Sequence, residues 1–178
     1  MERYVTFLRG INVGGHHKLP MAELKLVFND LGFQNTTTLL NSGNAIFDAP
    51  NTNIKKLEDQ IGAALEHKFG FPVPTIVRTA SFIQALGDLN PFETITVTKD
   101  IRLYVSFLQE DTNPEITLPW SSEDQAYQIL SKIEQTIISV LDVSITNTPK
   151  AMEALEKFYG KGITTRNWNT ITKFLQKI

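Results

Sequence analysis

The sequence contains no cysteine, and this absence excludes several classes of protein. A disulfide-stabilised scaffold, a catalytic thiolate and cysteine-based zinc or iron–sulfur sites are all ruled out. Histidine is scarce as well, with three residues in the chain, so we expect no histidine-rich metal centre. We therefore predict no metal site, and nothing in the composition points to a particular cofactor.

The chain also lacks the run of about eighteen apolar residues that a membrane-spanning helix requires. Close behind Met1 it enters a strand-like segment instead of the apolar core of a signal peptide. From these two observations we predict a cytoplasmic protein that has no membrane partner.

The remaining composition is that of an ordinary globular protein, with 178 residues, 42% hydrophobic and 20% charged. The formal charge of −2 conceals basic ends, because residues 1–20 carry +2, residues 150–178 carry +4 and the stretch between them carries −8. Such an arrangement predicts positive potential held for a local anion. Chance variation in short segments explains the same charges equally well.

The first half of the chain alternates between strand and helix patterns. β-branched and aromatic runs predict strands, and apolar residues at helical spacing predict helices that end at glycines. The expected elements are a strand over Tyr4–Leu8, a helix from Pro20 to Gly32, strands over Thr36–Leu40 and Ala45–Phe47, a helix over Asn53–Phe69 and a strand over Val73–Thr79. This β-α-β-β-α-β order predicts a ferredoxin-like α-β plait, also called the split βαβ fold.

The second half repeats this order in a degenerate form. After a short helix over Ser81–Leu86 and a boundary near Asn90-Pro91, we expect a strand over Ile101–Leu108, a loop over Gln109–Ser122, a hairpin of Tyr127–Ile133 with Thr136–Ile145, a helix over Ala151–Tyr159, a brief strand over Ile163–Thr165 and a helix over Trp168–Ile178. A helix also fits residues 125–146. The fold class is thus α+β with two ferredoxin-like halves, assigned to residues 1–96 and 97–178. Beyond the shared element order, no internal sequence repeat is evident.

The glycine-rich segment after the first strand is the main candidate for a binding site. Gly14 and Gly15 allow backbone N–H groups to converge, and the following helix adds its N-terminal N–H groups. Arg9 and Lys18 flank the glycines with positive charge. The segment therefore predicts a cradle for phosphate or carboxylate, to which Asn12 and His16 add hydrogen bonds. A mobile surface loop with turn glycines is an equally good interpretation.

Two further polar segments interrupt apolar patterns. Asn41-Ser42-Gly43-Asn44 is either a hairpin turn or a ring of amide donors and acceptors. In residues 164–170, the Arg166 guanidinium offers a planar fork for oxyanions, with Asn167 beside it. Trp168 either packs into the core or serves as a platform on which a base stacks.

Classical catalytic patterns are missing from the sequence. We find no Ser-His-Asp order, zinc-binding H-E-x-x-H or nucleophile elbow. His16 is the single candidate for an acid or base, so whether the protein is an enzyme stays open.

The same segments carry a resemblance to a known family. Residues 7–15, Lys18 to Met21, Asn41–Asn44 and Thr165–Thr170 with Lys173 are similar to the signature of the bacterial domain-of-unknown-function family 1697. The resemblance implies two ferredoxin-like halves and brings no activity or cofactor. Three positions depart from the family pattern: Asn41 where glutamine is usual, His17 where asparagine or lysine is common, and Asn147–Lys150 in place of a Gly/Ser-Lys stretch.

From these observations we predict one polar pocket where the two halves meet, holding a small anionic ligand such as a nucleotide or another phosphate compound. The residues expected to bind the ligand are Arg9, Asn12, Gly14, Gly15, His16, Lys18, Asn41, Ser42, Asn44, Arg166 and Asn167. Binding of single-stranded nucleic acid on the sheet is the second hypothesis, and an enzyme that uses His16 is the third. The sequence does not indicate an oligomeric state.

Overall fold

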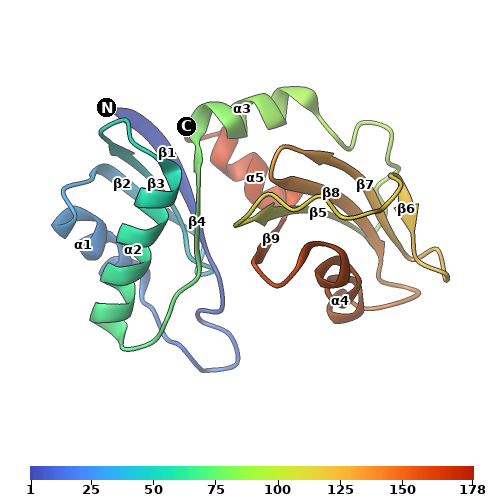
Figure 1. The fold of residues 1–178 in the computed structure, drawn as a ribbon, viewed down its shortest axis with the longest axis horizontal. Helices are drawn as coiled ribbons and strands as arrows, with labels where there is room; N and C mark the ends of the chain where they lie inside the picture. The colour runs from blue at the N-terminus through green and yellow to red at the C-terminus, as the bar shows by residue number, and fades with distance from the viewer. The chain divides into compact units, whose positions relative to one another are not determined.

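The computed structural model describes residues 1–178 as a mixed α+β fold with two antiparallel sheets and five helices (Figure 1). The chain divides into two compact units, which we describe separately. The first unit is Met1–Asp88 together with Lys173–Ile178, and the second is Leu89–Thr172. The division falls before the predicted boundary at residue 96, and the end of the chain belongs with the first unit.

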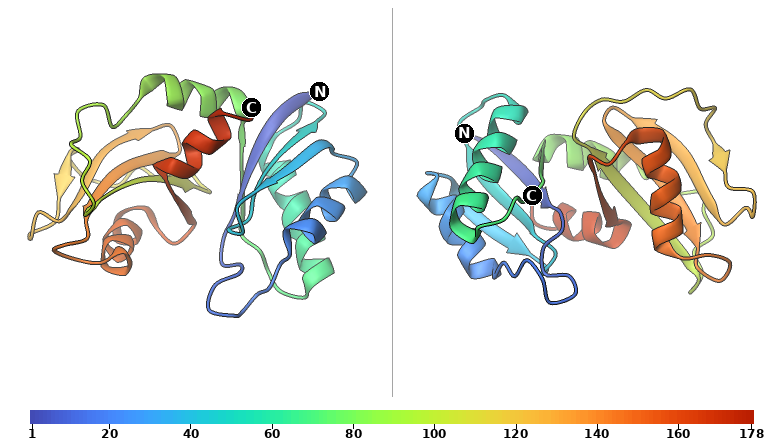
Figure 2. Two further views of the ribbon diagram at one scale, coloured as in Figure 1. Left: turned by 180° about the vertical axis from the view of Figure 1, so that it is seen from behind. Right: turned by 60° about the horizontal axis from the view of Figure 1, so that its bottom comes forward.

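The first unit is built on a four-stranded antiparallel sheet in the order β2-β3-β1-β4. Its strands and helices are β1 (Glu2–Leu8), α1 (Met21–Asp30), β2 (Gln34–Leu39), β3 (Asn44–Ala49), α2 (Ile54–Phe69), β4 (Thr75–Thr79) and the greater part of α3 (Ala80–Leu89). The first six follow the predicted order. Helices α1 and α2 cover one face of the sheet (Figures 1 and 2).

Alternation along β1 explains the two buried faces of this sheet. Tyr4 and Leu8 point into the core formed with α1 and α2, and both are almost fully buried. Phe7 points to the opposite face, where its ring meets that of Phe174 edge-on at 5.4 Å. The hydrophobic run that predicted a strand therefore reflects burial on both faces.

Local signals in the sequence place the ends of the helices. The Asn53 side chain caps α2 by accepting the N–H of Lys56, and Gly70 ends the helix in the left-handed conformation with φ +79°. Pro20 precedes α1 as its N-cap residue, and no side chain caps that helix. Its first-turn N–H groups consequently lack the side-chain acceptor that α2 has.

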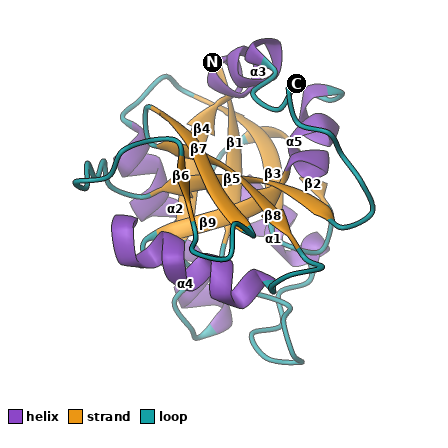
Figure 3. Ribbon diagram, turned by 90° about the vertical axis from the view of Figure 1, so that its right-hand side faces the viewer, coloured by secondary structure: helices purple, strands orange, loops and turns teal.

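The second unit is built on a five-stranded antiparallel sheet in the order β6-β7-β8-β5-β9. Its elements are β5 (Ile101–Leu108), β6 (Trp120–Ser121), β7 (Tyr127–Ile133), β8 (Thr136–Asp142), α4 (Thr148–Tyr159), β9 (Ile163–Asn167) and the start of α5 (Trp168–Leu175). Figure 3 faces this unit and shows its strands side by side, with α4 next to β9. The predicted hairpin over residues 127–145 is therefore present, and the alternative of a helix there is wrong.

The segment between β5 and β7 takes the place that α1 has in the first unit. It contains the short strand β6, where the sequence predicted only a loop. Ile116, Leu118 and Trp120 pack against the core of the second unit, and the Trp120 ring meets Phe158 at 5.0 Å. An irregular chain with apolar residues thus covers the core where the first unit uses a helix.

Strands β1 and β5 are also related in sequence, so the expectation that the halves share no sequence repeat is wrong. Tyr4–Leu8 and Tyr104–Leu108 differ only in threonine versus serine at the third position. The hydrogen bonds at their ends correspond as well. The N–H of Leu8 donates to Gly43 O and that of Leu108 to Gln135 O, both at 2.8 Å. The two units therefore share register as well as element order.

A buried ion pair closes the outer edge of β4. The carboxylate of Glu58 on α2 accepts the N–H of Val77 at 2.9 Å, and Arg78 donates to the carbonyl oxygen of Val77 at 2.7 Å. Glu58 Oε1 and Arg78 Nη1 lie 3.6 Å apart. Burial raises the pKa of Glu58, and the Val77 N–H and Arg78 oppose this rise. The pair thus satisfies strand groups that have no neighbouring strand.

Glu58→Ala is expected to destabilise the protein by about 3–5 kcal/mol, because the substitution leaves Arg78 and the Val77 N–H buried without their carboxylate. Urea denaturation measures this loss. Asp59→Asn, on the exposed side of the same helix, serves as the control and changes stability by less than about 0.5 kcal/mol. Equal effects of the two substitutions would contradict a role for the buried pair.

Candidate functional site

The glycine pair forms the tip of a short hairpin. Gly14 and Gly15 have φ of +60° and +77°, and the N–H of His16 donates to Val13 O across them at 3.1 Å. Below the tip, the N–H of Asn12 donates to His17 O at 3.1 Å. Two consecutive residues with positive φ are typical of a type I′ turn, which fits the twist of the paired strands. The segment projects from the first unit between β1 and α1 (Figure 2).

The Asn12 side chain holds the base of this hairpin. Its amide nitrogen donates to Leu19 O at 2.9 Å and to Asn41 O at 2.8 Å, while its oxygen accepts the Leu19 N–H at 2.8 Å. One side chain therefore joins the segment before α1 to the turn between β2 and β3. Both N–H donors of the Asn12 amide are therefore used within the protein, and this side chain positions the segment. That Asn12 also contacts a ligand stays a prediction.

His17 fixes the opposite side of the hairpin. Its ring stacks on Phe71 with centroids 4.3 Å apart, and Nδ1 lies 3.1 Å from Gly10 O. His16 is exposed beside the tip. His16, the residue that the sequence suggested as an acid or base, therefore faces solvent. His17 makes the structural contacts instead.

The turn between β2 and β3 packs tightly against the end of β1. Asn44 is buried and donates to Leu39 O at 3.0 Å and to Ser42 Oγ at 2.8 Å. Gly43 has φ +77°, and a Cβ there would lie 2.7 Å from the Cβ of Leu8. The bond between Ser42 and Asn44 thus shapes the turn. A glycine is required at position 43, because φ is positive there and a Cβ would have no room beside Leu8.

A hollow of about 450 Å³ lies beside the start of α1. Polar side chains, three apolar residues that we call the apolar floor (residues 19–21) and the backbone of the hairpin tip line it. The lining residues are Asn12, Gly15, Lys18, Leu19, Pro20, Met21 and Asn41. Lys18 is exposed and supplies positive charge at this hollow. Four residues predicted from sequence, Asn12, Gly15, Lys18 and Asn41, are therefore brought together within the first unit. The sequence missed the apolar floor, because residues 19–21 look like an ordinary helix start.

Arg9 lies at the end of β1, partly buried, and its N–H donates to Pro74 O at 3.0 Å. Arg166 and Asn167 belong to the second unit, at the end of β9. Arg166 is partly buried and donates from Nη1 to Thr165 O at 3.0 Å, and burial lowers the pKa of its guanidinium to about 10. That Arg166 and Asn167 share a pocket with the glycine hairpin stays a prediction.

The aromatic residues do not form an exposed stacking surface on the strands. Tyr4, Phe7, Tyr104 and Phe107 are all buried. Trp168 is partly buried and meets Phe92 edge-on at 5.3 Å. The contact with Phe92 supports the packing role that the sequence left open for this tryptophan. Sheets that bind single-stranded nucleic acid stack its bases on exposed aromatic side chains. These four buried rings do not provide such a pair.

No group of three or more histidine, aspartate and glutamate side chains lies close enough together to bind a metal ion. None of the five helices combines the length and apolar character that a membrane crossing needs.

A family model described as "Protein of unknown function (DUF1697)" matches residues 1–138. The chain belongs to this family. The match contains the glycine hairpin and the turn at residues 41–44, whereas the segment around Arg166 lies beyond it.

The chain resembles a solved structure over nearly its whole length. That structure is described as the structure of conserved bacterial protein SP0830 from Streptococcus pneumoniae, with 22% sequence identity and a TM-score of 0.72. The likeness covers 98% of this chain and 97% of that one, and at this identity it establishes the fold alone. No curated protein matches the chain.

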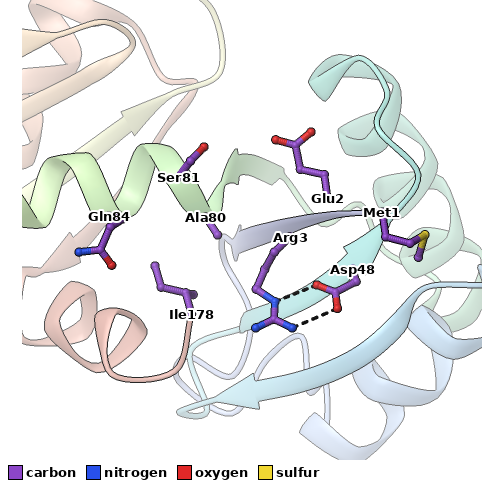
Figure 4. A pocket seen from close by; sticks show the side chains of 8 residues that line it. All are labelled: Met1, Glu2, Arg3, Asp48, Ala80, Ser81, Gln84 and Ile178. Carbon is purple, nitrogen blue, oxygen red and sulfur yellow. Dashed lines mark hydrogen bonds and ion pairs between the residues drawn. The ribbon is translucent and has the colours of Figure 1, made fainter.

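A second hollow in the first unit, of about 500 Å³, lies between the start of β1 and the start of α3 (Figure 4). Its main charged feature is the Arg3 guanidinium, which donates to both carboxylate oxygens of Asp48 at 2.8 and 3.1 Å. The Asn35 amide donates to the same carboxylate at 2.7 Å. The charged groups of this hollow therefore bond one another. This makes it a weaker candidate for a ligand-binding site than the hollow beside α1.

Asn12→Ala is expected to destabilise the protein by about 2 kcal/mol and to expose residues 9–20 to protease, because three hydrogen bonds are lost together. Urea denaturation and limited proteolysis measure these effects. Asn29→Ala, which removes an exposed amide on α1, is the matched control. Unchanged cleavage of the hairpin in Asn12→Ala would show that this side chain does not hold it.

The Arg3 and Asn35 donors hold the pKa of Asp48 below its usual range, with hydrogen bonding from Arg3 as the main cause. The ionised carboxylate therefore contributes stability that is present above its unfolded pKa and is lost as pH falls through the folded one. The wild type is therefore more stable than Asp48→Asn at about pH 6. We expect this difference in the free energy of unfolding to shrink as the pH is lowered to about 2.5. Denaturation midpoints at both pH values test this, with Asp30→Asn as an exposed control. A constant difference would contradict the assignment.

Proposed function

We propose that the first unit binds a small anionic ligand, a nucleotide or another phosphate compound, in the hollow beside α1. The observation that carries this proposal is the uncapped N-terminus of α1, which lies at a hollow that Lys18 lines. A helix N-terminus provides N–H donors and the positive end of the helix dipole, both of which favour an anion.

The parts of the hollow have complementary roles in this proposal. Lys18 provides charge and the backbone at Gly15 allows close approach. Asn12 fixes Asn41, another lining residue, since it donates to the carbonyl oxygen of Asn41. Glu23 in the first turn of α1 opposes an anion, but its carboxylate pairs with Lys68 at 3.2 Å. The balance of nearby charge therefore remains favourable to a phosphate group.

The lining also favours a particular part of the ligand. Leu19, Pro20 and Met21 offer an apolar floor, and none of the lining side chains is aromatic. Recognition is therefore assigned to the phosphate and not to the stacking of a base. Arg166 and Asn167 remain proposed contributors, as the sequence predicted.

We also propose that the first unit is ferredoxin-like and the second a degenerate copy of it. Support comes from the order β2-β3-β1-β4, which the strands β7-β8-β5-β9 of the second unit repeat. The second copy lacks a helix between its first two long strands.

Lys18→Ala is expected to weaken binding of phosphate compounds. A panel of inorganic phosphate, nucleoside monophosphates and sugar phosphates is screened by thermal shift. A compound at 100 times its dissociation constant adds about 2.7 kcal/mol of stability to the wild type. The variant requires roughly tenfold more compound for the same shift, because a charged hydrogen bond is lost.

Lys56→Ala removes the same charge from an exposed position on α2 and serves as the control. If no compound in the panel stabilises the wild type, or if both lysine variants respond alike, the proposed site is wrong.

A further inference from the structure

In the second unit, a hollow of about 370 Å³ lies beside the connection from α4 to β9. Its volume is within the range of small-molecule sites. Every lining residue is a glycine or carries a polar group, unlike the hollow beside α1, which has the apolar floor. The lining includes one acidic and one basic side chain, so its formal charges cancel. The lining residues are Gln109, Glu110, Thr112, Tyr159, Gly160, Lys161 and Gly162.

Tyr159, the last residue of α4, places a hydroxyl at this hollow. The residue is 4% exposed, and its hydroxyl bonds no other group of the protein. The buried side-chain atoms that are sealed from solvent without a partner belong to Thr36, Tyr127, Thr136 and Ser139. Because Tyr159 is not among them, its hydroxyl is accessible from the hollow that this residue lines. Buried polar groups are nearly always paired, so this hydroxyl is available to a molecule in the hollow.

The Tyr159 hydroxyl is neutral. Burial raises the pKa of this phenol above its ordinary value. The group therefore keeps its proton near neutral pH, and it can both donate and accept a hydrogen bond.

Two further neutral groups line the same hollow. The side chains of Gln109 and Thr112 are partly buried, and neither bonds another group of the protein. The amide offers two donors and an acceptor, and the hydroxyl can act as either. The hollow thus gathers three polar groups that have no partner within the chain and carry no charge.

The backbone holds these groups in place. The N–H of Gln109 donates to Gly162 O at 2.8 Å. A Cβ at Gly162 would lie 3.4 Å from the Cβ of Gln109 and 3.6 Å from its Oε1, so the glutamine side chain lies close against this glycine. The side chains on either side of Thr112 both accept from Lys132 Nζ on β7. The segment after β5 is therefore anchored at both ends of its contact with the hollow.

Comparison with the first unit shows that the Tyr159 hydroxyl is not needed to end the helix. Gly70 and Gly160 follow α2 and α4, and each donates its N–H to the carbonyl oxygen four residues back at 2.8 Å. The residue before the glycine is Phe69 in the first unit and Tyr159 in the second. Phe69 and Phe71 pack against the apolar core, with ring centroids 6.2 Å apart. The second unit thus has polar groups where the first has apolar rings.

We propose that this hollow binds the hydroxyl groups of a small neutral sugar. Sugar hydroxyls both donate and accept, which matches the groups of Gln109, Thr112 and Tyr159. The cancelling charges of the lining favour a neutral ligand over a free ion. The buried ring of Tyr159 leaves no aromatic face on which a base could stack. The inference goes beyond the phosphate site proposed for the first unit.

Titration of the intact chain with D-ribose and D-glucose tests this site by amide NMR. The backbone resonances of Gly160 and Gly162 are expected to shift and to saturate at one midpoint for each sugar that binds. Tetrahydropyran, a ring of similar size without hydroxyl groups, produces no such shift, and neither do sodium acetate and ammonium chloride. The resonance of Gly70 at the end of α2 stays in place.

Tyr159→Phe removes only the hydroxyl and leaves the residue type that ends α2. The titration midpoint is expected to rise roughly fivefold, because a hydrogen bond between neutral groups is lost. Tyr127→Phe is the matched control, since it removes a sealed hydroxyl from the same core, and its midpoint remains that of the wild type. Gln109→Met removes the amide at similar side-chain size and raises the midpoint as Tyr159→Phe does.

The proposal is overturned if neither sugar moves the Gly160 and Gly162 resonances, or if tetrahydropyran moves them equally. It also fails if Tyr159→Phe or Gln109→Met titrates like the wild type, or if Tyr127→Phe weakens binding as much as they do. A response to acetate or ammonium without a response to the sugars would assign the hollow to an ion and reject the sugar. These readouts lie in the second unit, so they are separate from the Lys18 experiment.

Discussion

The amide of Asn12 is the interaction on which the candidate site depends. It satisfies both backbone groups of Leu19 and a carbonyl of the turn after β2, so it fixes two loops at once. A loop of this length has a large conformational entropy, which a few specific hydrogen bonds must offset before it can hold a ligand. The stack of His17 on Phe71 adds a second point of attachment. The glycine tip projects beyond these anchors and leaves the start of α1 accessible.

Two polar ends of elements in the first unit differ in whether a side chain closes them. In the first unit, the strand edge at Val77 is closed by a carboxylate of the protein itself, while the N-terminus of α1 is not closed by any side chain. Buried or partly buried polar groups are nearly always paired in folded proteins.

Much of the fold could be predicted from the sequence. The apolar spacing of α2, its asparagine cap and its closing glycine are local signals, as are the residue types of β5 and β7. The functional roles were harder to predict, because they depend on contacts between distant residues. That Asn12 binds a ligand stays a prediction, whereas its positioning role is evident only from its contacts with Leu19 and Asn41. The matching pentapeptides that begin at Tyr4 and Tyr104 were overlooked, because the segments that follow them differ completely. A hairpin and a helix follow one strand, and an irregular segment follows the other.

The most direct test of the central claim is an amide NMR titration of the full-length protein with inorganic phosphate, observed at Met21, Ala22 and Glu23. These residues form the first turn of α1, whose N–H groups have no side-chain cap. If the hollow is an anion site, their resonances shift together and saturate at one common midpoint, while those of the capped α2 first turn stay fixed. Unmoved first-turn resonances of α1 at saturating phosphate would contradict the account.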